Sequence, residues 1–231
     1  MVLELRNVSY VYPNNIVALN DVNAVFSEGE VTCIMGPGGS GKTTLLLIAS
    51  CILSPVSGEV LLDGVPLCSL LPGVRRRIGM LFQDPDDMLF NPTVYDELAY
   101  ALRQLVSDEA KVMNTVMDVS KMLGISHLLK RSTFTLSGSE KRKVALASIL
   151  TYDPDILLLD EPTGDLSIKD KLSLLKLLRS MKMRGKTIVI ATHDYAFAKN
   201  IADQVLVLNS GRVVFKGGLK LLTRRIFLKY L

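Results

Sequence analysis

The chain has 231 residues and a formal net charge of +4, with 48 % hydrophobic and 22 % charged residues. This length accommodates one large domain, and the composition is ordinary for a compact globular protein. The charge is small and spread along the chain, which favours solvated faces over a track for nucleic acid. The longest apolar run covers residues 45–53, whereas a membrane span needs roughly 20 such residues.

The sequence lacks the patterns of export signals, disulfide frameworks and metal sites. Glu4 and Arg6 fall where the apolar stretch of a secretory signal would begin, so we expect none. The three cysteines, Cys33, Cys51 and Cys68, are an odd number without paired metal-ligand spacing, which indicates buried, reduced thiols. We therefore expect a cytosolic protein whose membrane contacts come through a partner.

The first third of the chain is predicted to be mainly extended. Strand-forming runs occupy residues 2–5, 8–12, 16–26, 31–35, 60–62 and 78–82. A turn at Pro13-Asn14-Asn15 separates the second run from the third. The run at 31–35 is short and apolar, as is typical of a buried parallel strand, and a helix is predicted over residues 43–53.

The middle of the chain is predicted to be helical, and its last part alternates strands and helices. Helical spacing of apolar residues covers 94–105, 108–123 and 141–150. Strands are then predicted at 156–159, 187–191, 205–208 and 213–215, and helices at 172–183 and 195–202. We expect one domain over residues 1–231, in which residues 1–90 and 151–231 form an α/β core with a mainly parallel sheet and an amino-terminal antiparallel β subdomain, and residues 91–150 form an inserted helical subdomain.

A glycine-rich loop follows the predicted strand at 31–35 and fits the pattern G-x-x-x-x-G-K-[ST]. It consists of Gly36, Pro37, Gly38, Gly39, Ser40, Gly41, Lys42 and Thr43, with Thr44 next in the chain. Glycines let backbone N–H groups surround phosphate oxygens, and the start of the following helix adds its positive dipole. Lys42 is expected to reach the β- and γ-phosphates of ATP, and the Thr43 hydroxyl to bind Mg²⁺. These residues predict a P-loop NTPase core.

Two carboxylates follow the predicted strand at 156–159. Asp160, at the end of that strand, is placed to hold Mg²⁺ through its water shell. Glu161 then stands where a base could polarise the water that attacks the γ-phosphate. Beside a phosphate loop, this pair favours ATP hydrolysis over a strand that merely ends in an acidic turn.

Four further segments resemble the ATPase subunits of ABC transporters, and the resemblance covers essentially the whole chain. Leu136-Ser137-Gly138-Ser139-Glu140 is similar to the signature of that family. The resemblance implies that Ser137 and Gly138 close on the ATP held by a second subunit. It also implies that Gln83 approaches Mg²⁺ and the attacking water, that His193 contacts the γ-phosphate, and that Tyr12 stacks on adenine.

Residues 82–94 resemble the ATPases of energy-coupling-factor importers of cobalt, nickel and vitamins. The resemblance implies a head-to-tail pair of ATPase subunits at the cytoplasmic face of the membrane, driving a transmembrane coupling protein and a separate substrate-binding membrane protein. The transported substrate is not readable from the sequence, and export stays open. The alternative is a regulatory or non-transport ATPase of the same family with low turnover.

The sequence departs from the family pattern at three places. Ser139 replaces the second glycine of the signature, Glu140 replaces its glutamine, and Ser167 stands where an aspartate normally braces the dimer, while Asp165 lies two residues earlier. These changes predict a heterodimer with two unequal ATP sites, because this chain's own loop is complete whereas its signature is altered. The basic, amphipathic residues 218–231 are predicted to pack on the core or on a partner more readily than on a membrane surface.

Overall fold

The computed structural model describes residues 1–218, which form two sheets with helices between and outside them. One sheet has the strand order β2-β1-β4-β5 and is antiparallel. The other has the order β10-β9-β3-β8-β7-β6 and is parallel except for the β9–β10 hairpin. The predicted amphipathic segment lies, from residue 219 onward, outside the described residues.

The bounds of the strands and helices are as follows. The strands are β1 Leu3–Val11, β2 Val17–Phe26, β3 Val31–Met35, β4 Ser57–Leu62, β5 Val65–Pro66, β6 Ile78–Leu81, β7 Ile156–Asp160, β8 Thr187–Ala191, β9 Gln204–Asn209 and β10 Arg212–Gly218. The helices are α1 Lys42–Ala49, α2 Val94–Arg103, α3 Glu109–Met122, α4 Gly138–Leu150, α5 Ile168–Met183 and α6 Tyr195–Ile201. Within residues 1–218 no helix combines the length and the apolar content of a membrane span.

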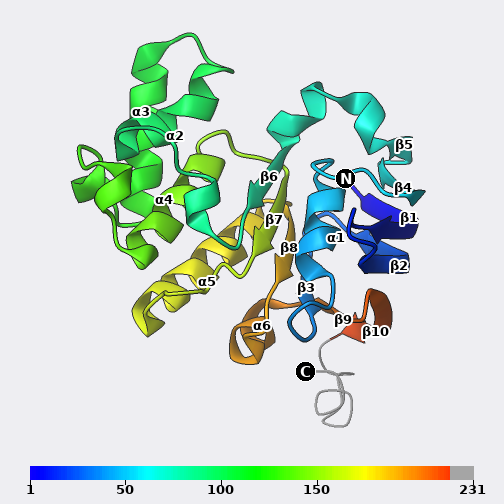
Figure 1. Ribbon diagram of the computed structural model, residues 1–231. Helices are drawn as coiled ribbons and strands as arrows, with labels where there is room; N and C mark the ends of the chain where they lie inside the picture. Colours follow the sequence, from blue (N-terminus) through cyan, green and yellow to red (C-terminus); the bar gives the residue numbers. More distant parts are fainter. Residues whose placement is uncertain (219–231) are drawn as a thin grey trace.

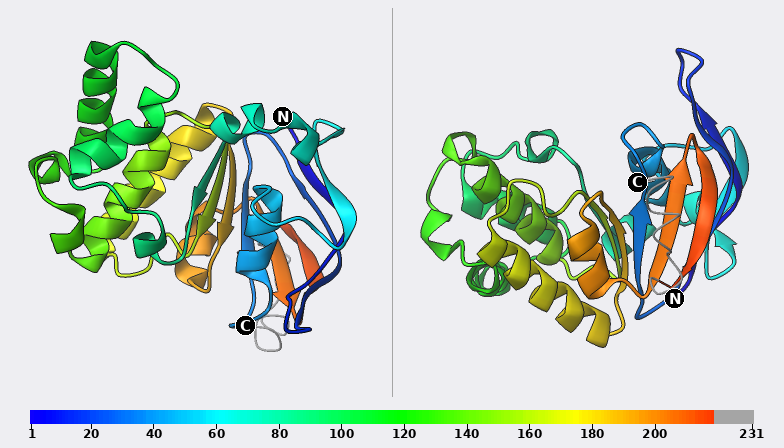
Figure 2. Two further views of the ribbon diagram at one scale, coloured as in Figure 1. Left: turned by 45° about the horizontal axis from the view of Figure 1, so that its top comes forward. Right: turned by 90° about the horizontal axis from the view of Figure 1, so that it is seen from below.

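Helix α1 lies between the two sheets, while α5 and α6 cover the opposite face of the parallel sheet (Figures 1 and 2). Successive strand residues point to opposite faces. In β3, Cys33 and Met35 therefore join the core beneath α5 and α6, whereas Ile34 joins the core around α1. Strands β3, β7 and β8 are buried at every residue, as expected for parallel strands covered on both faces.

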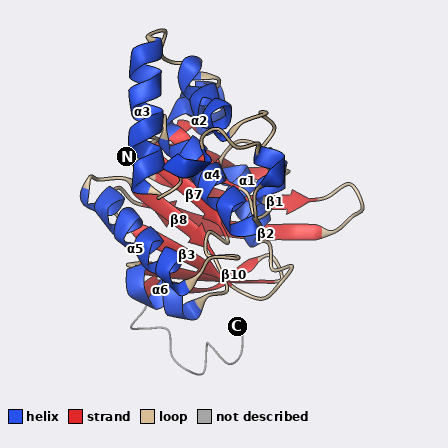
Figure 3. Cartoon of the chain, turned by 90° about the vertical axis from the view of Figure 1, so that its left-hand side faces the viewer, coloured by secondary structure: helices blue, strands red, loops and turns tan. Residues whose placement is uncertain are grey.

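Helices α2, α3 and α4 gather on the β7 side of the parallel sheet (Figure 3), where β6 is the edge strand. Each begins at a polar cap: Thr93 for α2, Asp108 for α3 and Ser137 for α4 accept a hydrogen bond from a backbone N–H in the first turn. The three helices all fall within residues 91–150, the range predicted for the helical subdomain.

Several elements have other bounds than the sequence predicts. The two runs at 2–5 and 8–12 form one strand, β1, whose pairing shifts register near Asn7, which has a left-handed φ of 49°. Helix α1 ends at Ala49 instead of residue 53, because Cys51 turns into the left-handed region with φ 56°. Strand β5 and the 3₁₀ turns at Leu67–Leu70 and Gly73–Arg77 are not predicted.

The contact between β6 and α4 leaves no room for a side chain at Gly79, which yields a first prediction. A Cβ there would lie 2.3 Å from Ile149 Cγ2 and 2.9 Å from Pro154 Cγ. We expect Gly79→Ala to lower the free energy of unfolding by about 1–3 kcal/mol through overpacking, measured by urea denaturation. Gly73→Ala is the matched control, because a Cβ at Gly73 meets nothing within 4 Å. Equal midpoints for the two variants would contradict this packing.

Candidate nucleotide site

The residues predicted for this chain's own nucleotide site meet in a cavity of about 780 Å³ at the carboxyl ends of the parallel strands. The loop after β3 supplies residues 36–41, β7 ends in Asp160, and the loop after β8 carries His193. Parallel neighbours end at the same edge of a sheet, and ligands bind at that edge in open α/β folds. The order β3-β8-β7 thus brings three distant segments together.

The phosphate loop depends on glycine at both ends. Gly36 has φ 148°, and a Cβ there would lie 2.0 Å from the carbonyl oxygen of Leu208. Gly41 has φ 105°, and its Cβ would lie 2.4 Å from the carbonyl oxygen of Ala18. Any side chain at these positions would displace backbone, so the loop keeps its close approach to β9 and β2 only with glycine.

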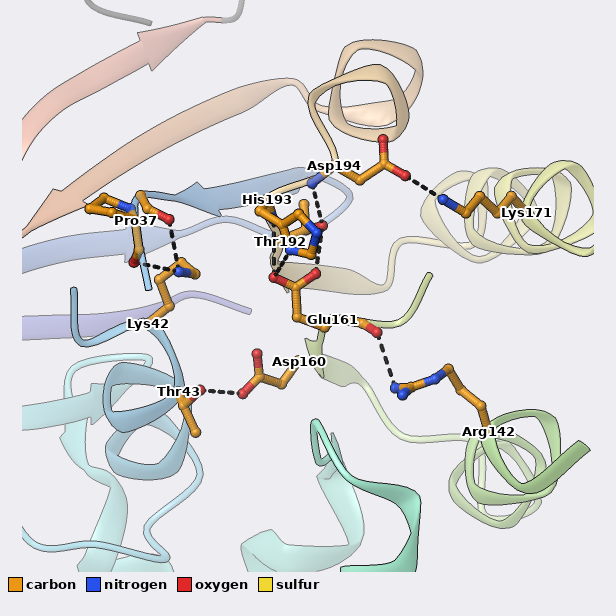
Figure 4. Close-up of polar contacts among 11 residues, drawn as sticks. Pro37, Lys42, Thr43, Arg142, Asp160, Glu161, Lys171, Thr192, His193 and Asp194 are labelled. Carbon is orange, nitrogen blue, oxygen red and sulfur yellow. Dashed lines mark hydrogen bonds and ion pairs between the residues drawn. The ribbon is translucent and has the colours of Figure 1, made fainter. Parts of the chain in front are cut away.

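Lys42 begins helix α1 and folds back over the loop. Its Nζ donates to the carbonyl oxygens of Gly36 at 2.8 Å and Pro37 at 3.0 Å (Figure 4). Partial burial lowers the pKa of Lys42, while the negative charges of Glu161 and Asp160 oppose that change. The ammonium therefore lines the cavity, where it is bonded to two loop carbonyls and attracted by two carboxylates.

Thr43 and Asp160 join the loop to the end of β7. The Thr43 hydroxyl donates to Asp160 Oδ2 at 2.6 Å, and the Asp160 side chain is almost completely buried. Burial raises the pKa of Asp160, and the hydrogen bond from Thr43 counteracts that effect. Two oxygen donors thus face each other directly beneath the phosphate loop.

Glu161 is held at its backbone N–H, its backbone carbonyl and its carboxylate. Its N–H donates to the carbonyl of Ala191 at 2.9 Å, and its Oε2 accepts from the Thr192 hydroxyl at 3.0 Å. Its Oε1 accepts from the backbone N–H of His193 at 3.0 Å and lies 2.7 Å from His193 Nδ1 (Figure 4). Because the Asp194 N–H donates to the Thr192 oxygen, the Thr192 hydrogen is directed at Glu161. The carboxylate therefore has one fixed orientation.

The remaining predicted residues of this chain's own site also line the cavity. Gln83 is exposed and borders both this cavity and a neighbouring one of about 630 Å³. Tyr12 lies at the other end, where its hydroxyl is 3.0 Å from the hydroxyl of Thr44. The imidazole of His193 is 81 % exposed, so it faces solvent above Glu161.

Ser137 and Gly138 lie outside this cavity, at the exposed start of α4. Ser137 forms a capping box with Glu140, whose Oε2 accepts from the Ser137 N–H at 2.7 Å and from its hydroxyl at 2.9 Å. These hydrogen bonds hold the pKa of Glu140 below its usual value. The N–H and the hydroxyl of Ser137 are therefore both hydrogen-bonded to the charged Glu140 carboxylate.

Ser167, where the family pattern has an aspartate, caps α5. Its hydroxyl accepts from the N–H of Asp170 and donates to the Asp170 carboxylate at 2.7 Å. Asp165 lies beside Gly138 and forms an ion pair with Arg142. The exposed Ser167 thus makes its hydrogen bonds within its own helix.

Two residues of the site were not predicted from the sequence. Thr192 follows a buried strand directly before His193, a position that could have suggested a hydrogen bond to a carboxylate. Arg142 lies five residues after Ser137, and nothing in the helical pattern indicates that it reaches Glu161.

Comparison with known proteins identifies the family. Residues 19–164 match the family model described as ABC transporter. A protein of Archaeoglobus fulgidus named as an ABC transporter ATP-binding protein is 42 % identical over 96 % of this chain and 92 % of its own length. The energy-coupling factor transporter ATP-binding protein EcfA of Methanothermobacter thermautotrophicus is 37 % identical over 93 % of this chain and 70 % of its own.

Solved structures agree with this assignment and confirm the predicted α/β P-loop NTPase fold. The structure of cbiO1 from Clostridium perfringens, part of the ABC transporter complex cbiONQ, has a TM-score of 0.83 and 34 % identity, covering 98 % of this chain and 92 % of its own. A dimeric ATP-binding cassette in a post-hydrolysis state, bound to ADP and Pi, has a TM-score of 0.87 and 30 % identity, covering 94 % and 98 %. The chain therefore belongs to the ABC transporter ATP-binding proteins and is an ATPase that binds ATP.

Proposed function

We propose that this chain is the ATP-hydrolysing motor subunit of an energy-coupling-factor type importer of a metal ion or vitamin. The likeness to EcfA and to cbiO1 supports the importer type. The resemblance of residues 82–94 to such ATPases supports it as well. The observation that carries the motor role is the fixed carboxylate of Glu161 beside the phosphate loop. The chain works at the cytoplasmic face of the membrane, bound to a transmembrane coupling protein and a substrate-binding membrane protein.

In this mechanism the chain's residues mainly position groups and stabilise charge, because phosphoryl transfer asks little covalent chemistry of a protein. The backbone N–H groups of the glycine-rich loop, in which only Pro37 has none, and the Lys42 ammonium bind the phosphates. Glu161 accepts a hydrogen bond from the attacking water and takes up its proton, while Thr192 and His193 hold the carboxylate in place. His193 and Gln83 line the open side of the cavity, next to the γ-phosphate, and Tyr12 stacks on adenine.

The donor set beneath the loop fits Mg²⁺. This ion is commonly bound by one or two protein oxygens together with waters and substrate phosphates, and Thr43 and Asp160 supply two such oxygens. Among residues 1–218, no three His, Cys, Asp or Glu side chains gather into a metal site of their own. Bound there with ATP, Mg²⁺ would neutralise phosphate charge during transfer.

The active unit is a head-to-tail dimer of ATPase subunits, and the dimeric state of the similar cassette bound to ADP and Pi supports a dimer. In that arrangement Ser137 and Gly138 face the ATP of the other subunit, which explains why they lie outside this chain's cavity. The Glu140 carboxylate then adds a negative charge next to that γ-phosphate, and it accepts the hydrogen bond of the Ser137 hydroxyl. This supports a heterodimer in which this chain's signature closes on the weaker site.

The motor role of Glu161 gives a second prediction. Glu161→Gln keeps the size of the side chain but removes its capacity to accept a proton. We expect ATP hydrolysis to fall by about 10²–10⁴-fold, measured as steady-state phosphate release. Binding of a fluorescent ATP analogue should stay unchanged, because residues 36–44 are untouched. Glu59→Gln, at an exposed position of β4, is the control. Undiminished hydrolysis in Glu161→Gln would remove Glu161 from this role.

The altered signature gives a third prediction. Glu140→Gln retains an oxygen that can cap α4 but removes the charge next to the partner's phosphate. We expect a lower KM for ATP in the assembled ATPase complex, by about two- to five-fold, with a smaller effect at high salt. Glu109→Gln removes a carboxylate from α3 and is the control. An unchanged or higher KM in Glu140→Gln would contradict the inhibitory role of the charge and favour a regulatory subunit with low turnover.

Transport itself tests the proposed function. The chain is co-expressed with the membrane proteins encoded beside its gene, and the complex is reconstituted in liposomes. Uptake of Co²⁺, Ni²⁺ or a vitamin is then measured with and without ATP. We expect ATP-dependent uptake that Glu161→Gln abolishes. A complex that lacks any membrane protein, or uptake that persists with Glu161→Gln, would overturn the proposal.

A further inference from the structure

We propose that Arg142 is a positioning residue that fixes the loop after β7, and through it Glu161, against helix α4. Its side chain is almost fully buried, with 7 % of its surface exposed. Arg142 Nη1 donates to the backbone carbonyl of Glu161 at 3.1 Å, and Nη2 lies 3.5 Å from Asp165 Oδ2. Figure 4 shows this guanidinium reaching from α4 toward Glu161. The inference rests on the role proposed above for Glu161.

The loop that Arg142 contacts has a demanding backbone. Glu161 and Asp165, at its two ends, both have left-handed φ values, 44° and 58°. Left-handed conformations are unfavourable for residues with a Cβ, so the surrounding contacts have to maintain them. Inside the loop, the N–H of Gly164 donates to the Glu161 carbonyl at 3.1 Å, so this oxygen accepts from both Gly164 and Arg142. Arg142 is therefore the side chain that fixes the direction of the Glu161 peptide.

The guanidinium is tightly enclosed by the loop. A Cβ on Gly164 would lie 3.0 Å from Arg142 Nη2 and 3.2 Å from its Cζ. The Nε atom is buried and has no hydrogen-bond partner, so the contacts of Nη1 and Nη2 with the loop are the polar contacts that hold this side chain. Without them, the Glu161 carbonyl and the Asp165 carboxylate each lose a partner.

The neighbouring residue on α4 makes a different connection. Lys143 Nζ pairs with Asp170 Oδ1 of α5 at 2.5 Å and does not reach the loop. Lys143 thus joins helix to helix, whereas Arg142 joins the helix that begins at Ser137 to the backbone of Glu161. A shift of α4 would therefore move the Glu161 peptide through Arg142, and Lys143, which pairs with α5 instead, is the matched control.

The fourth prediction separates positioning from binding. The hydrogen bonds and ion pairs described for Arg142 go to Glu161 and Asp165, and none goes to residues 36–44. Arg142→Met should therefore lower kcat for ATP hydrolysis by about ten-fold or more, because a misplaced base loses its alignment, while KM stays within about two-fold. Arg142→Lys keeps the positive charge but lacks the two Nη donors of the guanidinium, and it should give an intermediate kcat. Lys143→Met should leave kcat within about two-fold of the unsubstituted protein.

A second perturbation keeps the arginine and moves it. Gly164→Ala places a methyl group against the guanidinium and should reproduce the loss of kcat. In the double variant Arg142→Met with Gly164→Ala, kcat should be no lower than in Arg142→Met, because both changes remove one interaction. Thermal unfolding identifies any variant that does not fold. If Arg142→Met is such a variant, Arg142→Lys and Gly164→Ala decide the question.

The outcomes distinguish this inference from the proposed function. Folded Arg142→Met with kcat within two-fold of the unsubstituted protein, or a rise in KM that accounts for the whole loss of kcat/KM, overturns the role of Arg142 while Glu161→Gln still abolishes hydrolysis. Active Glu161→Gln instead overturns the role of Glu161, whatever Arg142 does. An equal loss of kcat in Lys143→Met would show that any loosening of α4 suffices, and would also overturn the specific role of Arg142.

Discussion

The parallel pairing of β3 with β8 and of β8 with β7 is the constraint on which the site depends. The pairing aligns three carboxyl ends at one edge, although β3 lies more than a hundred residues before β7 and β8 in the chain. Each strand is buried on both faces, so a slip of register would disrupt the packing of the hydrophobic cores on both sides of the sheet. The distances between the phosphate loop, Asp160 and Glu161 are therefore fixed by the register of the sheet.

On this frame, the site combines firmly fixed and exposed groups. The buried Asp160 accepts a hydrogen bond from Thr43, and Glu161 is bonded through its N–H, its carbonyl and its carboxylate. Gln83 and the imidazole of His193, in contrast, are exposed at the rim of the cavity. The fixed groups keep the reacting atoms aligned, while the exposed surfaces of Gln83 and of the His193 ring are accessible to a partner or a nucleotide.

Much of this arrangement could be predicted from the sequence, because its signals are local. The buried apolar runs at β3, β7 and β8 indicate parallel strands, and the glycine pattern at residues 36–43 indicates a phosphate loop. The predicted residues Asp160, Glu161 and His193 then follow from strand ends. What the sequence analysis missed includes one contact across the fold, that of Arg142 with the Glu161 carbonyl. It also missed one local contact, the capping box in which Glu140 engages the signature serine Ser137. Short 3₁₀ turns such as Gly73–Arg77 were missed because they lack a hydrophobic period.

Helix α1 has a consequence for how this protein can move. Its side chains Leu45, Leu46 and Ile48 have no exposed surface, since the helix is enclosed between the two sheets. Interiors packed this densely are nearly incompressible, so α1 can neither roll nor slide without opening one of the two cores. The phosphate loop at its start is accordingly an anchor. Any conformational change that ATP causes must therefore be a movement of other segments relative to this loop.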